Sequence, residues 1–516
     1  MDFNMPAPRT ADGGSVVDAG ERSAKRLASN DNRITRGGPL LLIGFVLTLL
    51  SDMPGSADIL AWFMPIPFLV YVARFRSARN RLWLLVVLVV ASILTLAKTA
   101  SDPLLMSVAF SVMSGTVTGL RFFIAYVLWD WIRKRTGNIA GILAFPVVII
   151  SLEYLQANYT PLGDWGALAN TQLSNLPLLQ TASLFGFLAI SAMMAWAAVL
   201  MASMALRGGI SRLRAHIAVF AVVFVALNVY GDLRLNQVPT GNYIRAAAIG
   251  TAYTFTGALP DPESPLIAST TDKLIADTIL AAHQGAAIAV WAEASTIVTP
   301  SGEAQLLDQL TKLAKADHIA IVAAYAVLLP EGSPYHLENK FTWLTDTGAI
   351  AETYRKHHPV PGEGSVPGQV PLRVISTAYG KMAGAICYDF DFPQIALTYA
   401  RLGADFVVLP GLDWRGMLRR HSLMARMRAI EGGFPILRPA DGATSMAFDS
   451  RGRILASLPN FGNNDRVMLA YMPVGRTLTL YSRIGNVLAY LALLTLFVLL
   501  IVACRNGHVR QRRPHP

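Results

Sequence analysis

Long apolar runs and a stretch of alternating apolar and polar residues divide this chain of 516 residues into a helical part and an α/β part. Because a helix needs about 20 apolar residues to cross a bilayer core, most of the long runs predict transmembrane helices. The first two runs are short, and Pro65 and Pro67 interrupt the second. The eight runs lie at about 39–53, 57–73, 82–98, 104–132, 139–156, 178–206, 215–230 and 484–504.

The block between the seventh and eighth apolar runs reads as alternating strands and helices. Short β-prone runs predict strands at 243–249, 286–291, 318–329, 372–375, 382–386, 406–409, 435–438 and 444–449, and a hairpin over 341–354. Amphipathic stretches predict helices at 269–284, 304–316, 394–402 and about 417–431. About 250 residues of this pattern can bury a complete α/β core, so we expect one soluble domain here.

The placement of arginine predicts the orientation in the membrane. Basic residues cluster after every second apolar run, whereas connections such as Ser51–Ser56 and Lys98–Pro103 carry almost none. By the positive-inside rule both termini are cytoplasmic and the soluble domain is extracytoplasmic. The expected divisions are a disordered cytoplasmic tail (1–38), transmembrane helices 1–7 (39–230), the extracytoplasmic domain (231–480), transmembrane helix 8 (481–504) and a basic cytoplasmic tail (505–516).

Composition supports a membrane protein and argues against other classes. Hydrophobic residues make up 53% of the chain and charged residues 15%, values that exclude a disordered protein. The net charge of +11 comes from short loops and tails, so we expect no nucleic-acid partner. The two cysteines, Cys387 and Cys504, provide no disulfide framework. Cys504, beside the last apolar run, is either lipidated or an incidental interfacial thiol.

Three chemically capable side chains directly follow predicted strands. Glu293 ends the run Val-Trp-Ala-Glu, Lys356 follows Tyr-Arg, and Cys387 follows Ala-Ile. Side chains at neighbouring strand ends converge on one rim of a sheet, so these three can meet. Cys387 would then be the nucleophile, Glu293 the base that takes and returns its proton, and Lys356 the cation facing the oxyanion.

Each of these residues also has a purely structural explanation. A single cysteine is often a small core residue, and on its own stretch Cys387 is equally a core residue or a nucleophile. If it is the nucleophile, an exposed turn near a helix N-terminus, together with Lys356, would lower its pKa. A Glu after a strand is commonly a turn residue, and Lys356-His-His is commonly a solvated loop.

At this point the sequence resembles a known superfamily. Trp-Ala-Glu293, Tyr-Arg-Lys356 and Cys387-Tyr-Asp, followed by Phe-Pro and Gly-Ala-Asp, resemble the Glu-Lys-Cys signature of the nitrilase, or carbon–nitrogen hydrolase, superfamily. The layout of helices, extracytoplasmic domain and final helix is similar to that of the bacterial apolipoprotein N-acyltransferase family. The resemblance implies about eight transmembrane helices joined to an αββα nitrilase-like sandwich in the bacterial inner membrane.

The resemblance also implies a reaction. Cys387 would take an acyl chain from a phospholipid as a thioester and pass it to the amine of a lipoprotein diacylglyceryl-cysteine. Glu363 and Tyr388, with the adjacent Asp389, would support the triad, and Trp414 on a mobile loop would grip acyl chains. A monomer embedded in the lipid bilayer, without a metal or organic cofactor, is expected.

The sequence departs from the family pattern at several positions. Ala292 and Asp389 stand where Pro and Glu are usual, and the loop Gly411-Leu-Asp-Trp-Arg replaces a Ser-Asn-Asp-Ala-Trp-Phe type. These changes keep two alternatives open: an acyltransferase with another amine acceptor, and a membrane-tethered amidase or nitrilase-type hydrolase. A catalytically idle scaffold is a third.

Two features of the helical part remain open. Arg121 interrupts the fourth apolar run, and a buried arginine in a membrane either has a role or snorkels to the interface. The loop 158–177, rich in aromatic residues, either lines an entry to the site or forms an interfacial belt.

Overall fold

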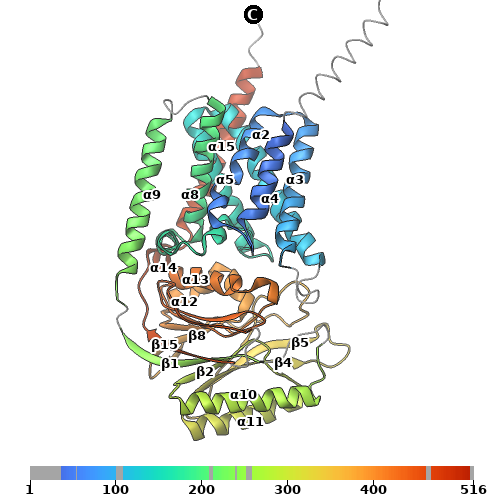
Figure 1. Ribbon diagram of the computed structural model, residues 1–516, viewed down its shortest axis with the longest axis vertical. Helices are drawn as coiled ribbons and strands as arrows, with labels where there is room; N and C mark the ends of the chain where they lie inside the picture. Colours follow the sequence, from blue (N-terminus) through green and yellow to red (C-terminus); the bar gives the residue numbers. More distant parts are fainter. Residues whose placement is uncertain are drawn as a thin grey trace, which may run out of the picture.

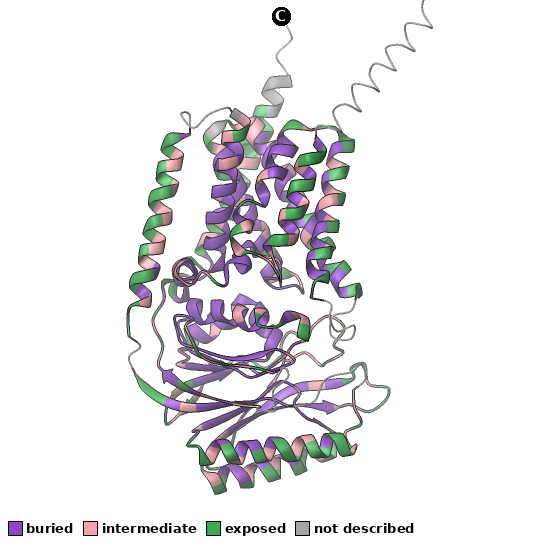
Figure 2. Cartoon of the chain, in the orientation of Figure 1, coloured by how far each residue is buried: buried purple, intermediate pink, exposed green. Residues whose placement is uncertain are grey.

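The computed structural model describes residues 37–53, 55–99, 108–207, 213–238, 241–251, 259–460 and 466–511. Most of the predicted tails 1–38 and 505–516 therefore lies outside the described residues. The described chain forms a helical bundle stacked on an α/β domain along the long axis of the molecule (Figure 1). Both parts have apolar cores, which Figure 2 shows as buried surfaces inside the bundle and between the sheets.

Six described helices are long and apolar enough to cross a membrane, which makes the chain a multi-pass membrane protein. They are α3 (Ala78–Ala97), α4 (Val108–Thr136), α5 (Asn138–Tyr159), α8 (Phe187–Arg207), α9 (Arg214–Leu235) and α15 (Val487–Gln511). The first predicted run is a shorter helix, Gly37–Ser51. The number of eight spans stays a prediction.

Two of the predicted runs are broken for identifiable reasons. In the second, Pro65 and Pro67 start a separate helix, α2 (Pro65–Arg74), after the 3₁₀ helix η1 (Asp58–Trp62). The sixth run begins as two short helices, α6 (Leu176–Leu179) and α7 (Ala182–Phe185), and Gly186 with φ +74° ends α7 before α8 starts. The prediction of one continuous helix over 178–206 is therefore wrong.

The soluble domain contains two facing β-sheets. The first has the strand order β15-β1-β2-β4-β5-β6, with β3 beside β4. Its strands β1, β2 and β4 run parallel, β4, β5 and β6 are joined as antiparallel pairs, and β15 closes the other edge antiparallel to β1. The bounds are β1 Asn242–Ile249, β2 Ile288–Trp291, β3 Ile297–Val298, β4 Ala320–Leu328, β5 Leu337–Leu344, β6 Ile350–Arg355 and β15 Val467–Val474.

The second sheet has the order β14-β13-β11-β9-β8-β7. A two-stranded pair, β10 with β12, lies beyond it. Apolar side chains of both sheets, Val290, Phe341, Ala383, Val407 and Met446 among them, fill the space between them. The bounds are β7 Ile375–Thr377, β8 Gly380–Gly384, β9 Phe406–Val408, β10 Gly411–Leu412, β11 Ile436–Arg438, β12 Ala440–Asp441, β13 Thr444–Phe448 and β14 Ile454–Pro459.

Helices cover both outer faces, so the predicted αββα sandwich is confirmed. Helices α10 (Pro265–His283) and α11 (Pro300–Asp317) pack on the first sheet, away from the bundle (Figure 1). Helices α12 (Pro393–Leu402) and α13 (Arg420–Gly432) lie between the second sheet and the bundle (Figure 1). Met424, Met427 and Ile430 of α13 belong to the same apolar cluster as the membrane helices. This helical layer therefore packs against the end of the bundle that is nearest the domain.

Most predicted strands and helices of the domain are present within a few residues of their predicted positions. The predicted strand 372–375 is wrong, because extended pairing starts only at Ile375. Strands β14 and β15 were not predicted. Strand β14 pairs with β13, the strand just before it, whereas β15 forms eight residue pairs with β1, which begins the domain.

Candidate active site

The three predicted catalytic residues come together between the two sheets. Glu293 lies two residues after β2 and Lys356 one residue after β6, both in the first sheet. Cys387 lies three residues after β8 of the second sheet and begins the 3₁₀ helix η3 (Cys387–Asp391). Strands β2 and β6 are not neighbours, because β4 and β5 separate them. The ends of β2 and β6 lie along one edge of the first sheet, and the end of β8 reaches them from the second sheet.

Lys356 links two carboxylates in the interior. Its Nζ donates to Glu293 Oε1 at 2.7 Å and to Glu363 Oε2 at 2.8 Å. The side-chain amide of Asn339 bridges the same carboxylates, donating to Glu293 Oε1 at 2.7 Å and to Glu363 Oε1 at 2.9 Å. Burial alone would lower the pKa of Lys356, but Glu293 and Glu363 raise it well above the ordinary value. Lys356 is therefore a permanent cation at the site.

Backbone groups fix both carboxylates. The N–H of Leu412 donates to Glu293 Oε2 at 2.8 Å, and the N–H of Val360 donates to Glu363 Oε2 at 2.8 Å. Burial acts to raise the pKa of Glu363, but Lys356 and its other hydrogen-bond donors lower it overall. Glu363, carried over from the resemblance, thus contacts Lys356 directly. Asn339 contacts both carboxylates too, and no motif in the sequence pointed to it.

Cys387 is held in a strained and buried position. Its φ is +46°, a left-handed conformation that is uncommon for a residue with a side chain, and its N–H donates to Pro410 O at 2.8 Å. Only 4% of the residue is exposed. Burial, with Glu293 as the next cause, raises the pKa of the Cys387 thiol to about 11. The expectation of an exposed turn with a lowered thiol pKa is therefore wrong, because both sheets and α13 enclose the turn.

The residues that follow Cys387 attach it to its surroundings. Asp389 is fully buried and accepts hydrogen bonds from Tyr354 Oη at 2.8 Å, from the N–H of Ile386 at 3.0 Å and from the N–H of His358 at 2.7 Å. Burial acts to raise the pKa of Asp389, but the bonds from His358 and Ile386 lower it overall. The ionised carboxylate of Asp389 thus holds the backbone next to Cys387, at Ile386, and the backbone next to Lys356, at His358.

Tyr388 points away from the sheets toward the helical bundle. Its hydroxyl donates to Pro161 O at 2.7 Å, in the loop that follows α5. In the same loop Trp165 donates from Nε1 to Asp391 Oδ2 at 2.7 Å and stacks on Trp414, with ring centroids 6.3 Å apart. The loop 158–177 therefore contacts the site directly. Trp414 itself is half-buried and donates to Thr99 O at 2.7 Å.

Arg121 is buried within the bundle and bonds to this same loop. It donates to Gln156 Oε1 at 2.8 Å and to Gly166 O, and Gln156 Nε2 donates to Trp165 O at 2.7 Å. Of the two readings of Arg121, the contacts favour a role over snorkelling, because its guanidinium meets protein atoms that hold Trp165. The arginine thereby supports the loop on the membrane side of Cys387.

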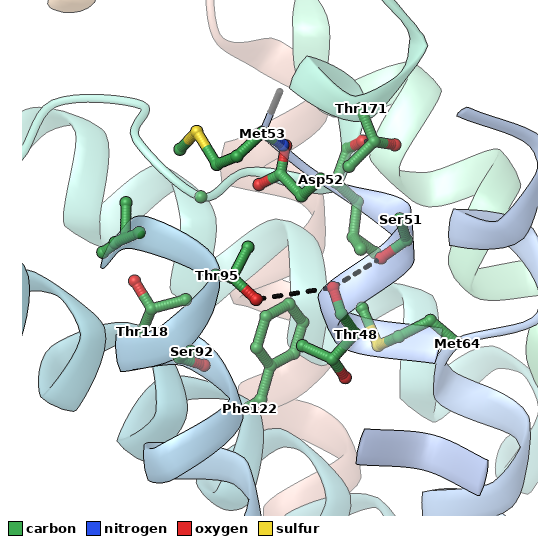
Figure 3. A pocket seen from close by; sticks show the side chains of 13 residues that line it. Thr48, Ser51, Asp52, Met53, Met64, Ser92, Thr95, Thr118, Phe122 and Thr171 are labelled. Carbon is green, nitrogen blue, oxygen red and sulfur yellow. Dashed lines mark hydrogen bonds between the residues drawn. The ribbon is translucent and has the colours of Figure 1, made fainter. Parts of the chain in front are cut away.

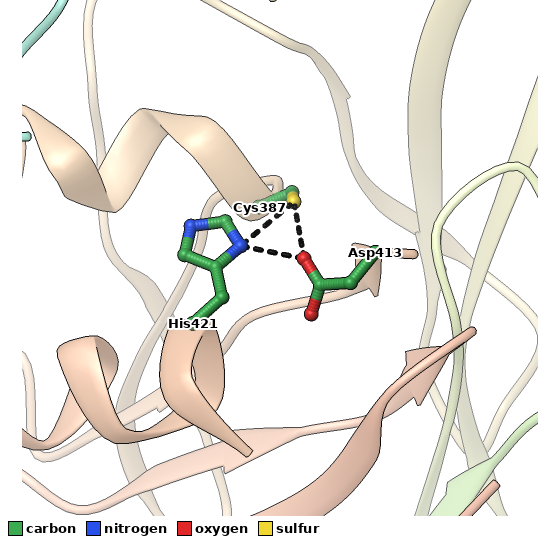
Figure 4. Close-up of side chains that lie close together, drawn as sticks. All are labelled: Cys387, Asp413 and His421. Atoms are coloured by element: carbon green, nitrogen blue, oxygen red, sulfur yellow. Dashed lines mark hydrogen bonds and ion pairs between the residues drawn. The ribbon is translucent and has the colours of Figure 1, made fainter. Parts of the chain in front are cut away.

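Behind the thiol lies a cluster of ionisable side chains that the sequence did not single out. His421 Nδ1 lies 2.5 Å from Asp413 Oδ1, and its Nε2 lies 3.0 Å from Asp391 Oδ2. Cys387 Sγ is 4.0 Å from His421 Nδ1 and 3.9 Å from Asp413 Oδ1, as Figure 4 shows. These contacts join residues up to 34 positions apart, so no local spacing could have revealed them.

Cys387, Asp413 and His421 are also grouped closely enough to hold a metal ion. Arg438 argues against that use, because its Nη2 lies 3.2 Å from Asp413 Oδ1, 3.2 Å from His421 Nδ1 and 3.8 Å from Cys387 Sγ. A fixed guanidinium thus occupies the place where a cation would bind, and its charge would repel one. The donor set does not fit a metal.

The bundle contains a pocket that is lined in part by Gly166, next to Trp165 in the loop after α5. Figure 3 shows the other side chains around it. The helix Gly37–Ser51, α3 and α4 contribute the hydroxyl groups of Thr48, Ser51, Ser92, Thr95 and Thr118. Thr95 Oγ1 donates to Ala91 O at 2.8 Å, so this hydroxyl is satisfied within its own helix. Glu293, Lys356 and Cys387 are not among the described residues that line the pocket.

Comparisons with known proteins cover both parts of the chain. Residues 245–476 match the family model described as carbon-nitrogen hydrolase, and residues 44–200 match the model described as apolipoprotein N-acyltransferase N-terminal domain. The apolipoprotein N-acyltransferase of Geobacter metallireducens is 24% identical over 505 residues, covering 92% of this chain and 96% of that protein. The enzyme of the same name from Bradyrhizobium diazoefficiens is 27% identical over 433 residues, covering 77% and 78%.

The domain alone is also similar to hydrolases. Human deaminated glutathione amidase is 29% identical over 135 residues, which cover 22% of this chain and 41% of that protein. Among solved structures, an amidase from Nesterenkonia sp. matches at 20% identity with a TM-score of 0.39, covering 49% of this chain and 98% of that one.

Proposed function

This chain belongs to the apolipoprotein N-acyltransferase family, and we propose that it moves a fatty acyl chain from a phospholipid to the N-terminal amine of a lipoprotein. The observation that carries the proposal is the position of the Glu293–Lys356–Cys387 group. It lies in a carbon–nitrogen hydrolase domain, next to the loop after α5 and helix α13, which contact both this domain and the membrane helices. A thiol in that position suits two substrates that are both anchored in a bilayer.

In the first half-reaction Cys387 Sγ attacks the ester carbonyl of the phospholipid. Because burial keeps the thiol protonated at neutral pH, Glu293 takes its proton as the new S–C bond forms. Lys356 faces the negative charge that develops on the carbonyl oxygen. The tetrahedral intermediate collapses with cleavage of the ester C–O bond, and Glu293 returns the proton to the departing oxygen. The products are a lysophospholipid and an acyl thioester on Cys387.

In the second half-reaction the α-amine of a diacylglyceryl-cysteine attacks the thioester. Glu293 accepts a proton from the amine, the S–C bond breaks, and Glu293 protonates the leaving sulfur. This order is favourable because a thioester acylates an amine far more readily than an ester does. The position of Glu363 beside Lys356 supports its role in holding the cation, and Trp414 and Trp165 are the aromatic groups that acyl chains would contact.

Similarity to bacterial apolipoprotein N-acyltransferases supports the bacterial inner membrane as the location, and the placement of arginine residues supports the periplasmic side for the domain. The hydroxyl-lined pocket beside Gly166 is then on the bilayer side of the site. Both lipid substrates would reach Cys387 from that direction. We expect a monomer to suffice, because the proposed triad comes from one chain.

Mass spectrometry of the purified protein tests the proposal. After incubation with phosphatidylethanolamine, we expect a fatty acyl mass on the peptide that contains Cys387, together with lysophospholipid in solution. Addition of a diacylglyceryl peptide should then discharge the acyl group and yield N-acylated peptide. Cys504→Ser is the matched control and should acylate normally, whereas Cys387→Ser should form no thioester.

Two outcomes would contradict the proposal. Absence of both acyl-enzyme and lysophospholipid with an intact Cys387 would exclude acyl transfer from phospholipid. Release of free fatty acid without acylated peptide would instead indicate a hydrolase, the activity class of the amidase relative.

A further inference from the structure

The Glu293–Lys356–Glu363 group by itself is a poor environment for a thiolate. Glu293 accepts hydrogen bonds from Lys356, Asn339 and the N–H of Leu412, and Glu363 is a second carboxylate on the same lysine. Two carboxylates and one ammonium leave this group with net negative charge, which opposes formation of a negative sulfur. Glu293 indeed acts, after burial, to raise the pKa of Cys387. The thiolate needs positive charge from elsewhere in the site.

That positive charge lies on the side of Cys387 formed by α13 and β11. Arg438 Nη2 is 3.8 Å from Cys387 Sγ and His421 Nδ1 is 4.0 Å from it. The carboxylate of Asp413, 3.9 Å from Sγ, offsets one of these two cations but not both. Within 4.0 Å of Sγ two cations therefore face one carboxylate, and the second carboxylate of the cluster, Asp391, lies on the far ring nitrogen of His421.

Geometry fixes the protonation state of His421. Nδ1 of His421 lies 2.5 Å from Asp413 Oδ1, and Nε2 lies 3.0 Å from Asp391 Oδ2. An ionised carboxylate can only accept a hydrogen bond. The form of the ring that donates to both carboxylates is the imidazolium, with Arg438 Nη2 also 3.2 Å from Nδ1. In agreement, burial would lower the pKa of His421, but Asp391 and Asp413 raise it well above the ordinary value. Arg438 is fixed in turn by Asp413, at 3.0 Å, and by Ser422 Oγ, at 2.8 Å.

We propose that His421 and Arg438 form a second cationic group, separate from Lys356, that stabilises the negative sulfur of Cys387 during attack and thioester cleavage. The proposal rests on the proposed function only in taking Cys387 as the nucleophile. Asp391 is a positioning residue, because it contacts His421 and not the sulfur. Trp165 extends this support to the helical bundle, since its indole N–H holds Asp391 at 2.7 Å.

The charged groups that face the pair come from five elements. Asp391 and Cys387 belong to η3, and Asp413 follows β10. Asp164, directly before Trp165 in the loop after α5, donates its N–H to Asp391 O at 2.9 Å. On the triad side Glu293 and Lys356 face the sulfur. None of these groups changes between the variants compared below, so a shift in the titration of Cys387 reports the altered cation.

The test is the pH dependence of Cys387 alkylation by iodoacetamide in the detergent-solubilised full chain. All variants carry Cys504→Ser, so that the label measures Cys387 alone. We expect His421→Gln and Arg438→Gln each to move the midpoint to higher pH by about one unit or more, which is about a tenfold slower reaction at pH 8. Arg438→Lys, which keeps the charge, should react close to the parent rate. The matched control is His283→Gln, an exposed histidine of α10.

Thermal unfolding shows whether each variant is folded. If His421→Gln does not fold, the comparison of Arg438→Gln with Arg438→Lys still tests the proposal. Unchanged midpoints in folded His421→Gln and Arg438→Gln would overturn the proposal, because a merely structural role leaves the thiol titration in place. Alkylation requires no lipid substrate. Failure of acyl transfer with shifted midpoints would therefore sink the proposed function and leave this inference standing.

Discussion

The carboxylate of Glu431, on α13 of the soluble domain, accepts a hydrogen bond from the backbone N–H of Phe187 at 2.7 Å. Phe187 is the first residue of the membrane helix α8, so a side chain of one part satisfies the exposed helix end of the other. Glu431 also pairs with Arg428 at 3.2 Å, and Arg428 reaches Asp164 in the loop after α5 at 3.2 Å. The two parts are thus joined through buried charges.

Removal of Arg428 should destabilise the whole molecule. Arg428→Met leaves the buried carboxylates of Asp164 and Glu431 without their cation, which typically costs about 3–5 kcal/mol. We expect a clear fall in the thermal unfolding midpoint in detergent. Lys312→Met, which removes a fully solvated ion pair with Asp308, is the control and should change stability by at most about 0.5 kcal/mol. Equal midpoints for the two variants would show that the buried cluster contributes little.

Restoring the family's usual residue at position 389 should harm the protein. Asp389 has no exposed surface, and its carboxylate already meets Tyr354, His358 and Ile386. Asp389→Glu inserts a methylene into this space and should cost about 1–3 kcal/mol. We expect a lower unfolding midpoint together with slower acylation of Cys387. A more stable and more active Asp389→Glu variant would mean that the site has room for the longer side chain.

Stability should depend on pH through Asp441. Burial raises the pKa of this carboxyl from 3.8 to about 7, against hydrogen bonds from Thr251 and Asn460. Between those two values the folded chain holds a proton that the unfolded chain has released, so the free energy of unfolding falls as pH rises. Asp441→Asn removes this slope. The difference between its unfolding midpoint and that of the parent should therefore become more favourable to the variant as pH rises from 5 to 8. The exposed Asp308→Asn is the control, and an identical slope in Asp441→Asn would refute the assignment.

Glu363 should matter for rate more than for folding. Its carboxylate fixes Lys356 Nζ at 2.8 Å, and Glu363→Gln keeps the shape while removing the charge that holds the cation. We expect the rate of acyl-enzyme formation to fall by about tenfold to a hundredfold, the range for removing a residue that orients a reacting group. Glu338→Gln, which pairs with Lys340 and Arg355 outside the triad, should remain within about twofold. Equal rates for both variants would leave Glu363 without a role in the reaction.

Much of the domain could be predicted because its strands carry local signals. Buried parallel strands such as β2 are short apolar runs and α11 is an amphipathic stretch, so both were found, although α11 begins at Pro300, four residues before the predicted start. The edge strand β15 was missed although Val467–Val474 is itself a short apolar run, and its partner β1 lies at the opposite end of the domain. The bundle was harder, because hydropathy does not show where Gly186 ends one helix and Phe187 begins another.

The same contrast applies to the site. Glu293, Lys356 and Cys387 could be proposed because each directly follows a predicted strand, but their burial depends on α13 packing from far along the chain. The pairing of His421 with Asp391 and of Trp165 with Asp391 requires three separate segments to be folded together. No spacing within one segment encodes such contacts. The thiol pKa was therefore predicted in the wrong direction.

The order of the elements has a consequence for how the molecule is assembled. Helix α15, the last membrane-spanning helix, packs against α5 and α4, and strand β15, just before it, closes the first sheet beside β1. The bundle and the first sheet therefore each lack their last element until almost all of the domain of more than 200 residues has been synthesised. The helical bundle can therefore be completed only after the soluble domain has been synthesised.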